Sequence, residues 1–393
     1  MNGGAWAALD GVGPRRLEPV VRRAVGCAGA RVGAWAWQPL DYQSFLADRT
    51  LVRFSGSALG VAGHAEPVAW SSVLKLMHQP AIDPSGPVTS TGREVLAYRS
   101  SLLERLPGPL RAPRLYAIDD DPDGTVWLWL EDVHDIYDHH WPLEQFGLAA
   151  RHLGQFNGAF LLATDRPHYP WFIDWLERHW INHQAELAQT PDVWGDLERL
   201  ARQPAVRRAC GADIGPRLAR LIDDQAALVA GLARLPATLC HHESSLANLF
   251  AVHGPAGQLV TVAVDWEQVG YGCLGADIST LVFGSMRRCE IDARRAVELE
   301  RAVFDGYVDG LRLAGWQGPL AAVRFGYCAA LALRWGVLRQ TLRMLVEGAR
   351  PLRTSQGWLV PGEQVVQQWV RLGAFTLERA DEARRLMADV TLH

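Results

Sequence analysis

The pattern of apolar residues changes near residue 142, and this change constrains the fold more than any other feature of the chain. Before it, short runs rich in aromatic and β-branched residues alternate with polar or glycine-containing turns, at 32–37, 50–54 and 71–77. Such runs predict a small antiparallel sheet. After it, apolar residues recur at helical spacing over long segments, at 142–162, 217–235, 293–313, 320–347 and 362–387. The sequence therefore predicts an α+β fold with a strand-rich first third and a mostly helical remainder.

Weaker signals complete the first third. Residues 15–25 have the spacing of a short amphipathic helix. A second helix is expected from Thr91 to residue 106, because Pro107, Gly108 and Pro109 stop it there. Segments 114–118 and 126–130 predict a strand pair. We therefore expect two lobes with a cleft between them, an N-lobe over 1–133 with one main helix and a helical C-lobe over 134–393.

Composition narrows the class of partner. The chain of 393 residues has a net charge of −4, which argues against nucleic acid or an anionic membrane as the main partner. Its six cysteines have neither disulfide-framework nor zinc-site spacing. No leader and no apolar stretch long enough to span a bilayer is recognised. We expect a cytoplasmic protein with a small-molecule partner, and the oligomeric state stays open.

Lysine occurs only at position 75, in the third strand-like run, although arginine is plentiful. A coding bias towards arginine explains the general loss of lysine but leaves this exception unexplained. A compact ammonium differs from a guanidinium where a point charge must reach phosphate oxygens. Lys75 is therefore a candidate phosphate ligand, with chance survival as the alternative.

A short non-helical island interrupts the helical part. A strand-like run ends at His241, His242 and Glu243, Asn248 follows, and an apolar run at 259–264 ends at Asp265. Carboxylate and amide oxygens at strand ends are the hard ligands that a divalent metal with a polyphosphate requires. The island is therefore the candidate centre of the chemistry.

The order of these residues resembles the aminoglycoside phosphotransferase and choline kinase family, whose core is similar to that of protein kinases. In that family the catalytic loop reads His-Gly-Asp, four residues and Asn, and a second Asp follows an apolar strand. His241, Asn248 and Asp265 match this pattern. Further counterparts follow the family's order over almost the whole chain, at Lys75, Glu94, Tyr98, 130–133, 153–158, Gly270, Gly275 and Asp277.

The resemblance implies a nucleotide site for ATP or GTP with Mg²⁺. Lys75 would contact the α- and β-phosphates, and Glu94 would pair with Lys75. The backbone from Glu131 to Val133 would receive the adenine. Thr91 and Glu94 also fit a capping box, and Glu104 is an alternative partner for Lys75.

The resemblance also implies the roles of the island. Asn248 and Asp265 would ligate Mg²⁺, His241 would be a buried scaffold residue, and Asp277 would anchor the loop. Asn248 as a turn residue and Asp265 as a strand-end cap are the alternatives. His179 and His183 have the i, i+4 spacing of a metal pair, but a solvated helix face is the preferred interpretation.

The chain departs from the family at the chemical centre. Glu243 stands where the family has the catalytic Asp, and a misplacement of about 1 Å can cost about a hundredfold in rate. His242 replaces a small residue. The hairpin expected to cover the phosphates contains no glycine from residue 34 to 55, and bulky residues at 41–48 fill it.

Three functions remain open. The first is a phosphotransferase acting on a hydroxyl or amine of a metabolite or natural product, with Glu243 as the base. The second is an enzyme of specialised metabolism that uses Glu243 and His242 for acid–base chemistry such as cyclisation, isomerisation or elimination. The third is a nucleotide-binding pseudokinase. A polycationic antibiotic is not the preferred acceptor, because no dense acidic cluster occurs in the second lobe.

Overall fold

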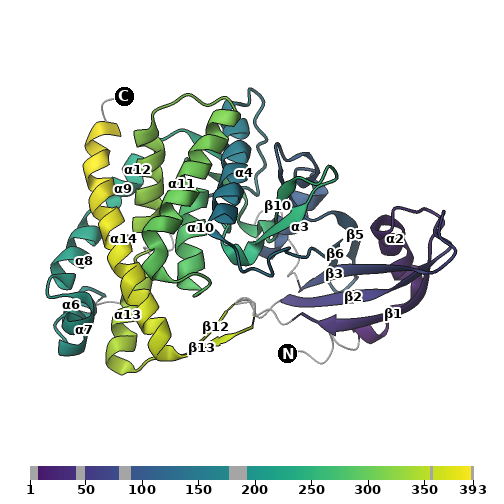
Figure 1. Ribbon diagram of the computed structural model, residues 1–393, viewed down its shortest axis with the longest axis horizontal. Helices are drawn as coiled ribbons and strands as arrows, with labels where there is room; N and C mark the ends of the chain where they lie inside the picture. Colours follow the sequence, from purple (N-terminus) through teal and green to yellow (C-terminus); the bar gives the residue numbers. More distant parts are fainter. Residues whose placement is uncertain (1–7, 41–48, 79–89, 177–192, 355–356, 391–393) are drawn as a thin grey trace. The chain divides into compact units, whose positions relative to one another are not determined.

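The computed structural model describes residues 8–40, 49–78, 90–176, 193–354 and 357–390 (Figure 1). The chain divides into two compact units. Unit 1 comprises Met1–Arg105 and Arg111–His134, and unit 2 comprises Leu106–Leu110 and Asp135–His393. The predicted α+β fold, with a small antiparallel sheet in the first unit and mainly helices in the second, is confirmed.

Unit 1 is built on one five-stranded sheet in the order β1-β2-β3-β6-β5. All neighbouring strands are antiparallel. The strands are β1 (Arg31–Pro39), β2 (Arg49–Leu59), β3 (Val68–His78), β5 (Leu115–Asp120) and β6 (Thr125–Glu131). Two helices accompany them, α2 (Pro14–Ala24) and α3 (Ser90–Arg99).

The core of unit 1 is rich in aromatic side chains. Trp127 and Trp129 of β6 are almost fully buried, and Phe54 of β2 packs edge-on against Trp129 with ring centroids 5.0 Å apart. From α2, Leu17 and Val20 complete this core. Since β6 is buried on both faces as far as Leu130, the central strands form a rigid platform for β3.

Unit 2 consists mainly of helices, and α4, α10, α11, α12 and α14 run side by side (Figure 1). Close backbone approach joins α4 to α11, because a Cβ at Gly154 would lie 3.0 Å from the Leu311 nitrogen. The helices are α4 (Leu143–Leu162), α6 (Val193–Ala201), α7 (Pro204–Cys210), α8 (Ile214–Asp223), α9 (Gln225–Leu232), α10 (Ala276–Arg287), α11 (Ala296–Leu313), α12 (Leu320–Ala332), α13 (Gly336–Glu347) and α14 (Gly362–Val390).

Short strands carry the non-helical island of unit 2. β8 (Ala237–Cys240) pairs antiparallel with β11 (Gly270–Cys273), which pairs parallel with β7 (Ile173–Asp174). β9 (Leu249–His253) and β10 (Leu259–Ala263) form a hairpin, with β4 (Leu110–Arg111) beside β10. The remaining pair is β12 (Leu352–Arg353) with β13 (Leu359–Val360).

Three predicted helices are shorter or divided in the structure. The helix expected to reach residue 106 ends at Arg99, because Ser101 has a φ of 57° and Ser100 Oγ bonds back to the Ala97 carbonyl. The segment 217–235 divides at Asp224, whose carboxylate binds Arg384 of α14. The segment 320–347 divides at residues 333–335, just before Gly336, a residue of low helix propensity.

The helical stretch Leu320–Glu347 is long and apolar enough to cross a membrane, contrary to the expectation from the sequence. Of its apolar window, 67% is buried inside the protein. Burial of this extent is typical of a core helix, and the stretch is interrupted between α12 and α13. All six cysteines are free, as their spacing predicted.

Candidate functional site

Lys75 and Glu94 form a buried ion pair within unit 1. Lys75 lies in the middle of β3, between Leu51 of β2 and Leu128 of β6. Its Nζ donates to both carboxylate oxygens of Glu94, each at 2.9 Å. Lys75 is 8% exposed and Glu94 1%. Glu94 therefore does pair with Lys75 from α3, and Glu104, the alternative partner, is exposed.

The segment predicted to receive adenine follows directly from β6. Arg111 binds both carboxylate oxygens of Glu131, at 2.6 and 3.0 Å, and the Arg114 backbone N–H donates to the same carboxylate. Burial raises the pKa of Glu131, but these donors outweigh burial and leave the pKa lowered. Arg53 likewise donates from Nε and Nη2 to the two carboxylate oxygens of Asp132. Anchored carboxylates thus flank the backbone that leads to Val133, whose contact with adenine stays a prediction.

In unit 2, Asp277 fixes the loop that follows β8. Its carboxylate accepts hydrogen bonds from the backbone N–H groups of His241, at 3.1 Å, and His242, at 2.7 Å. Asp277 is fully buried in the first turn of α10, where the helix dipole favours a negative charge. His242 has a φ of 66°, a left-handed conformation that costs energy for a residue with a side chain. The two hydrogen bonds to Asp277 hold the loop in this conformation.

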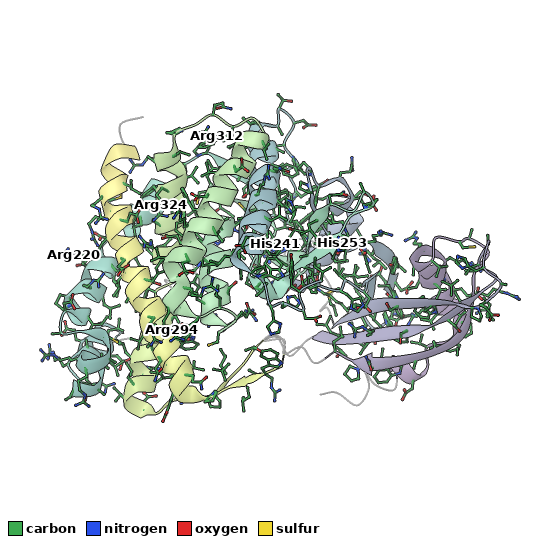
Figure 2. All side chains as sticks on the ribbon, in the orientation of Figure 1. Arg220, His241, His253, Arg294, Arg312 and Arg324 are labelled. Atoms are coloured by element: carbon green, nitrogen blue, oxygen red, sulfur yellow. The ribbon has the colours of Figure 1, made fainter. Side chains whose placement is uncertain are left out.

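His241 connects the loop to the strand that precedes Asp265. Its Nε2 lies 3.0 Å from the Val264 carbonyl oxygen, and its Nδ1 accepts the Glu243 backbone N–H at 3.2 Å. This pattern assigns the proton to Nε2. The ring is fully buried and meets Trp266 edge-on at 4.5 Å (His241 is labelled in Figure 2). The geometry is that of a scaffold residue.

Asn248 and Asp265 come together through the backbone. The Asn248 carbonyl oxygen accepts the Val264 N–H at 2.9 Å, which places Asn248 beside the peptide that leads to Asp265. Asn248 Nδ2 donates to the Glu243 carbonyl at 2.9 Å, so Oδ1 is the side-chain atom that would face a cation. Asp265 adopts the left-handed conformation, with φ 66° and ψ 64°. One carboxylate and one amide oxygen fit the hard-ligand preference of Mg²⁺.

Comparison with known proteins identifies the fold. No family model and no curated protein matches the chain. An aminoglycoside phosphotransferase from Alicyclobacillus acidocaldarius subsp. acidocaldarius is similar in structure, with a TM-score of 0.51 and 17% identity over 90% of this chain and 94% of that one. The chain has the fold of an aminoglycoside phosphotransferase.

Two further structures are similar at a lower score. An aminoglycoside phosphotransferase from Streptomyces rimosus matches with a TM-score of 0.43 and 17% identity, over 81% of this chain and 96% of that chain. A choline/ethanolamine kinase family protein from Mesorhizobium loti matches with a TM-score of 0.45 and 15% identity, over 91% of this chain and 93% of that chain. At these identities the likeness concerns the fold alone.

The structure places the two unusual residues of this phosphotransferase fold in different surroundings. Glu243 is partly exposed, and its carbonyl oxygen accepts from Ser245 N at 2.8 Å. His242 is buried and stacks on Trp175, with centroids 5.7 Å apart and planes within 4°. Burial lowers the pKa of His242 to about 4, so the ring is neutral near pH 7. Neither ring nitrogen makes a hydrogen bond of normal geometry to another described residue.

Asn157 and Tyr307 complete the support of the loop, and these two roles were not predicted from the sequence. Asn157 Nδ2 donates to Asp277 at 3.1 Å and to the Leu239 carbonyl at 2.8 Å, while Oδ1 accepts the Tyr307 hydroxyl at 2.8 Å. All three polar side chains are fully buried. The available signal was an amide on an apolar face of a predicted helix, between Phe156 and Gly158.

Cys240, His242 and Asp277 bring one possible ligand atom each within 4.8 Å of one another, as a metal site would. Both Asp277 oxygens, however, already accept N–H donors. Burial also raises the pKa of the Cys240 thiol well above its ordinary value, which keeps it protonated. The cluster is therefore part of the loop support. The hairpin residues 41–48 and the pair His179 and His183 lie outside the described residues.

Proposed function

We propose that this chain is an ATP- and Mg²⁺-dependent phosphotransferase that transfers phosphate to a hydroxyl or amine of a small metabolite or natural product. The observation that carries the proposal is the ion pair between Lys75 Nζ and Glu94 at 2.9 Å. It fixes the chain's single lysine in the arrangement that phosphotransferases of this kind use for nucleotide phosphates. Stability alone does not explain why this residue is lysine, because a buried ion pair can often be replaced by well-packed apolar residues without loss of stability.

Asn248 and Asp265 are the residues that would hold the metal. They lie side by side through the bond between the Asn248 carbonyl and the Val264 N–H, and the amide is already oriented by the Glu243 carbonyl. When bound, Mg²⁺ neutralises charge on the phosphate oxygens during transfer. ATP and GTP are both compatible with the proposal.

Glu243 is the proposed base, which orients the acceptor group and takes its proton. The loop is positioned through His241 and Asp277 independently of the length of the side chain at 243. Phosphoryl transfer depends mainly on positioning and charge neutralisation, so a glutamate can serve where the family has an aspartate.

The free thiols agree with a cytoplasmic location.

Acid–base chemistry by a Glu243 and His242 pair is less well supported. The His242 ring is 5% exposed, stacked on Trp175, and has a pKa of about 4. A neutral buried imidazole is poorly suited to donate protons near neutral pH. No observation favours this second function over phosphate transfer.

Nucleotide binding and turnover test the proposal. We expect millimolar MgATP to raise the melting temperature and an acceptor library to yield ADP. The double variant Lys75→Met with Glu94→Gln removes both charges together, so it should fold and yet lose ATP binding. Arg301→Gln, which alters an exposed pair with Asp305, is the matched control. Absence of any ATP effect in the wild type would refute the proposal, and binding without turnover on any acceptor would indicate a pseudokinase.

Glu243→Asp separates the remaining functions. A phosphotransferase should keep or gain transfer, because the substitution restores the family's residue. An acid–base enzyme tuned to the longer side chain should lose its activity. The measurement is ADP formation against product formation, at equal protein stability.

A further inference from the structure

One face of α10 lies against the loop that carries Glu243. Thr280, Gly284 and Arg287 are spaced at i, i+4 and i+7, so they share a face of the helix. Thr280 Oγ1 lies 3.3 Å from the His242 carbonyl oxygen, and a Cβ at Gly284 would lie 2.8 Å from Ser245 Cβ. Arg287 is the next residue along this face, and its side chain is exposed.

Arg334 reaches the same face from another element. It lies in the break between α12 and α13, and its Nη2 donates to Thr280 Oγ1 at 2.5 Å. Its guanidinium lies 5.7 Å from the centroid of the Phe283 ring. The Nε atom is buried and has no hydrogen-bond partner among the described residues.

Both guanidiniums are electrostatically coupled to Glu243. Desolvation lowers the pKa of Arg334 to about 10, while Glu243 raises it and Arg287 lowers it. Desolvation and Arg288 lower the pKa of Arg287, and Glu243 again raises it. The two arginines therefore share one neighbourhood with the proposed base.

These two arginines are not neutralised as others in unit 2 are. Within the described part of the chain, neither forms an ion pair with a carboxylate, whereas Arg324 binds two carboxylates and Arg379 three. The nearby Asp277 already accepts three N–H groups. Against desolvation, which lowers the pKa of Arg334, the nearby Glu243 and Asp277 both raise it. Since neither arginine forms an ion pair with a carboxylate in the described part of the chain, their N–H groups can bind a further anion.

We propose that Arg287 and Arg334 form an anion subsite beside Glu243, which binds a carboxylate or phosphate group carried by the acceptor substrate. The inference rests on the proposed function, because it takes Glu243 to face the acceptor. Guanidinium groups suit this task, since their N–H groups match the oxygens of carboxylate and phosphate. A polycationic acceptor would instead place its ammonium groups against two guanidiniums. The acceptor class is thus a hydroxylated or aminated organic acid or phosphate ester.

Matched sugars test the subsite by binding, without need of turnover. Glucuronate, glucose 6-phosphate, glucose and glucosamine share a pyranose ring and differ in charge. Their affinities for the full chain are measured at constant ionic strength, with and without saturating MgAMP-PNP. We expect an anionic sugar to bind at least about tenfold more tightly than glucosamine, as a charge-assisted hydrogen bond predicts. A preference for glucuronate or for glucose 6-phosphate tells which anion the subsite takes.

Variants locate the effect. Arg287→Gln and Arg334→Gln should each weaken the anionic sugar about tenfold and leave glucose unchanged. Arg334→Lys keeps the positive charge but loses the paired N–H groups of the guanidinium. Its affinity for the anionic sugar should therefore lie between those of the wild type and of Arg334→Gln. Arg301→Gln should change nothing, and melting temperatures check that each variant is folded.

The outcomes separate the subsite from the proposed function. Equal affinity for the four sugars, no binding of either anionic sugar at about 100 mM, or unchanged affinity in the glutamine variants would overturn the subsite. Failure of MgAMP-PNP to bind, while the charge preference persists and depends on Arg287 and Arg334, would instead overturn the proposed function alone.

Discussion

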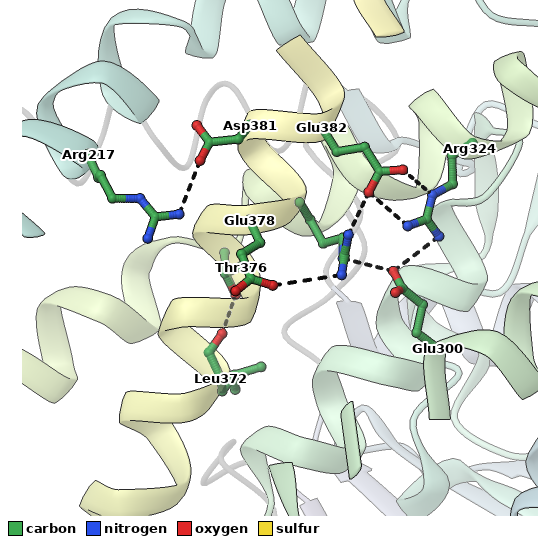
Figure 3. Close-up of polar contacts among 9 residues, drawn as sticks. Arg217, Glu300, Arg324, Leu372, Thr376, Glu378, Asp381 and Glu382 are labelled. Carbon is green, nitrogen blue, oxygen red and sulfur yellow. Dashed lines mark hydrogen bonds and ion pairs between the residues drawn. The ribbon is translucent and has the colours of Figure 1, made fainter. Parts of the chain in front are cut away.

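Two charge clusters, one in each unit, are built in different ways, and the cluster in unit 1 is the more deeply buried. In unit 1, Lys75 meets one carboxylate among the described residues, that of Glu94. In unit 2 a four-residue cluster joins three helices, as Figure 3 shows around α14: Glu300 of α11, Arg324 of α12, and Arg379 and Glu382 of α14. Each arginine of the four-residue cluster binds both carboxylates, at 2.6 to 3.1 Å.

The difference predicts how each cluster responds to the loss of one charged residue. Loss of one member of the four-residue cluster leaves every remaining charge with a partner of opposite sign. Loss of Glu94 removes the carboxylate that holds Lys75 Nζ at 2.9 Å from both of its oxygens. We infer that redundancy stabilises helix packing in unit 2, whereas the pair in unit 1 holds one ammonium in a defined position.

The largest effect on stability is expected from Glu94→Ala. The substitution leaves the ammonium of Lys75 in a site where it is 8% exposed. Breaking a buried pair on one side costs about 3–5 kcal/mol of unfolding free energy. Urea unfolding monitored by tryptophan fluorescence measures the loss. The double variant Lys75→Met with Glu94→Gln should recover most of it, and equal losses in both would show that charge is not the cause.

A smaller effect is expected from Arg379→Met in the four-residue cluster. Glu300 and Glu382 keep Arg324 as a partner, so we expect a loss of about 1.5–3 kcal/mol, the range for hydrogen bonds to charged groups. The same urea titration compares it with Glu94→Ala. A loss as large as that of Glu94→Ala would contradict the redundancy of the cluster.

Lowering the pH should gradually remove the stability that the four-residue cluster contributes. Burial raises the pKa of Glu382, but Arg324 and Arg379 outweigh it and lower the pKa from 4.5 to about 2. A lowered carboxyl pKa stabilises the fold above about pH 4.5, and this stability is lost as the pH falls towards 2. Burial raises the pKa of Glu300, and protonation of this second carboxylate as the pH falls opposes the loss.

Glu382→Gln tests the acid dependence. The variant should be less stable than the wild type at pH 7, and its stability should fall less between pH 4.5 and 2. Thermal unfolding at a series of pH values measures both slopes. Parallel curves for the two proteins would exclude Glu382 as the titrating group.

The smallest effect is expected at the surface of α11. Arg301 and Asp305 form an exposed pair at 3.8 Å, with side chains 84% and 71% accessible. Exposed pairs contribute about 0–1 kcal/mol, so Arg301→Gln should leave the urea midpoint nearly unchanged. A shift of the urea midpoint as large as that of Arg379→Met would mean that solvent exposure does not decide how much an ion pair contributes to stability.

The sequence by itself predicted the elements with a strong local signature. Alternating aromatic runs predicted the sheet of unit 1, and long helical periods predicted α4, α11 and α14. The pairing of Lys75 with Glu94 was predicted only through the resemblance to the aminoglycoside phosphotransferase and choline kinase family, and the structure contains this ion pair. The spacing of His241, Asn248 and Asp265 likewise predicted a loop of this fold.

Only the tertiary structure decided which distant residues meet around that loop. Asn157 and Tyr307 are 150 positions apart, yet their side chains share a hydrogen bond of 2.8 Å under Asp277. Arg334 reaches Thr280 because the helix breaks at residues 333–335, in a segment that the apolar period predicts as one helix. Contacts of this kind arise from packing between elements, which leaves no periodic trace in the sequence. The local pattern thus determined the division into a small sheet and a helical part, while packing determined what surrounds Glu243.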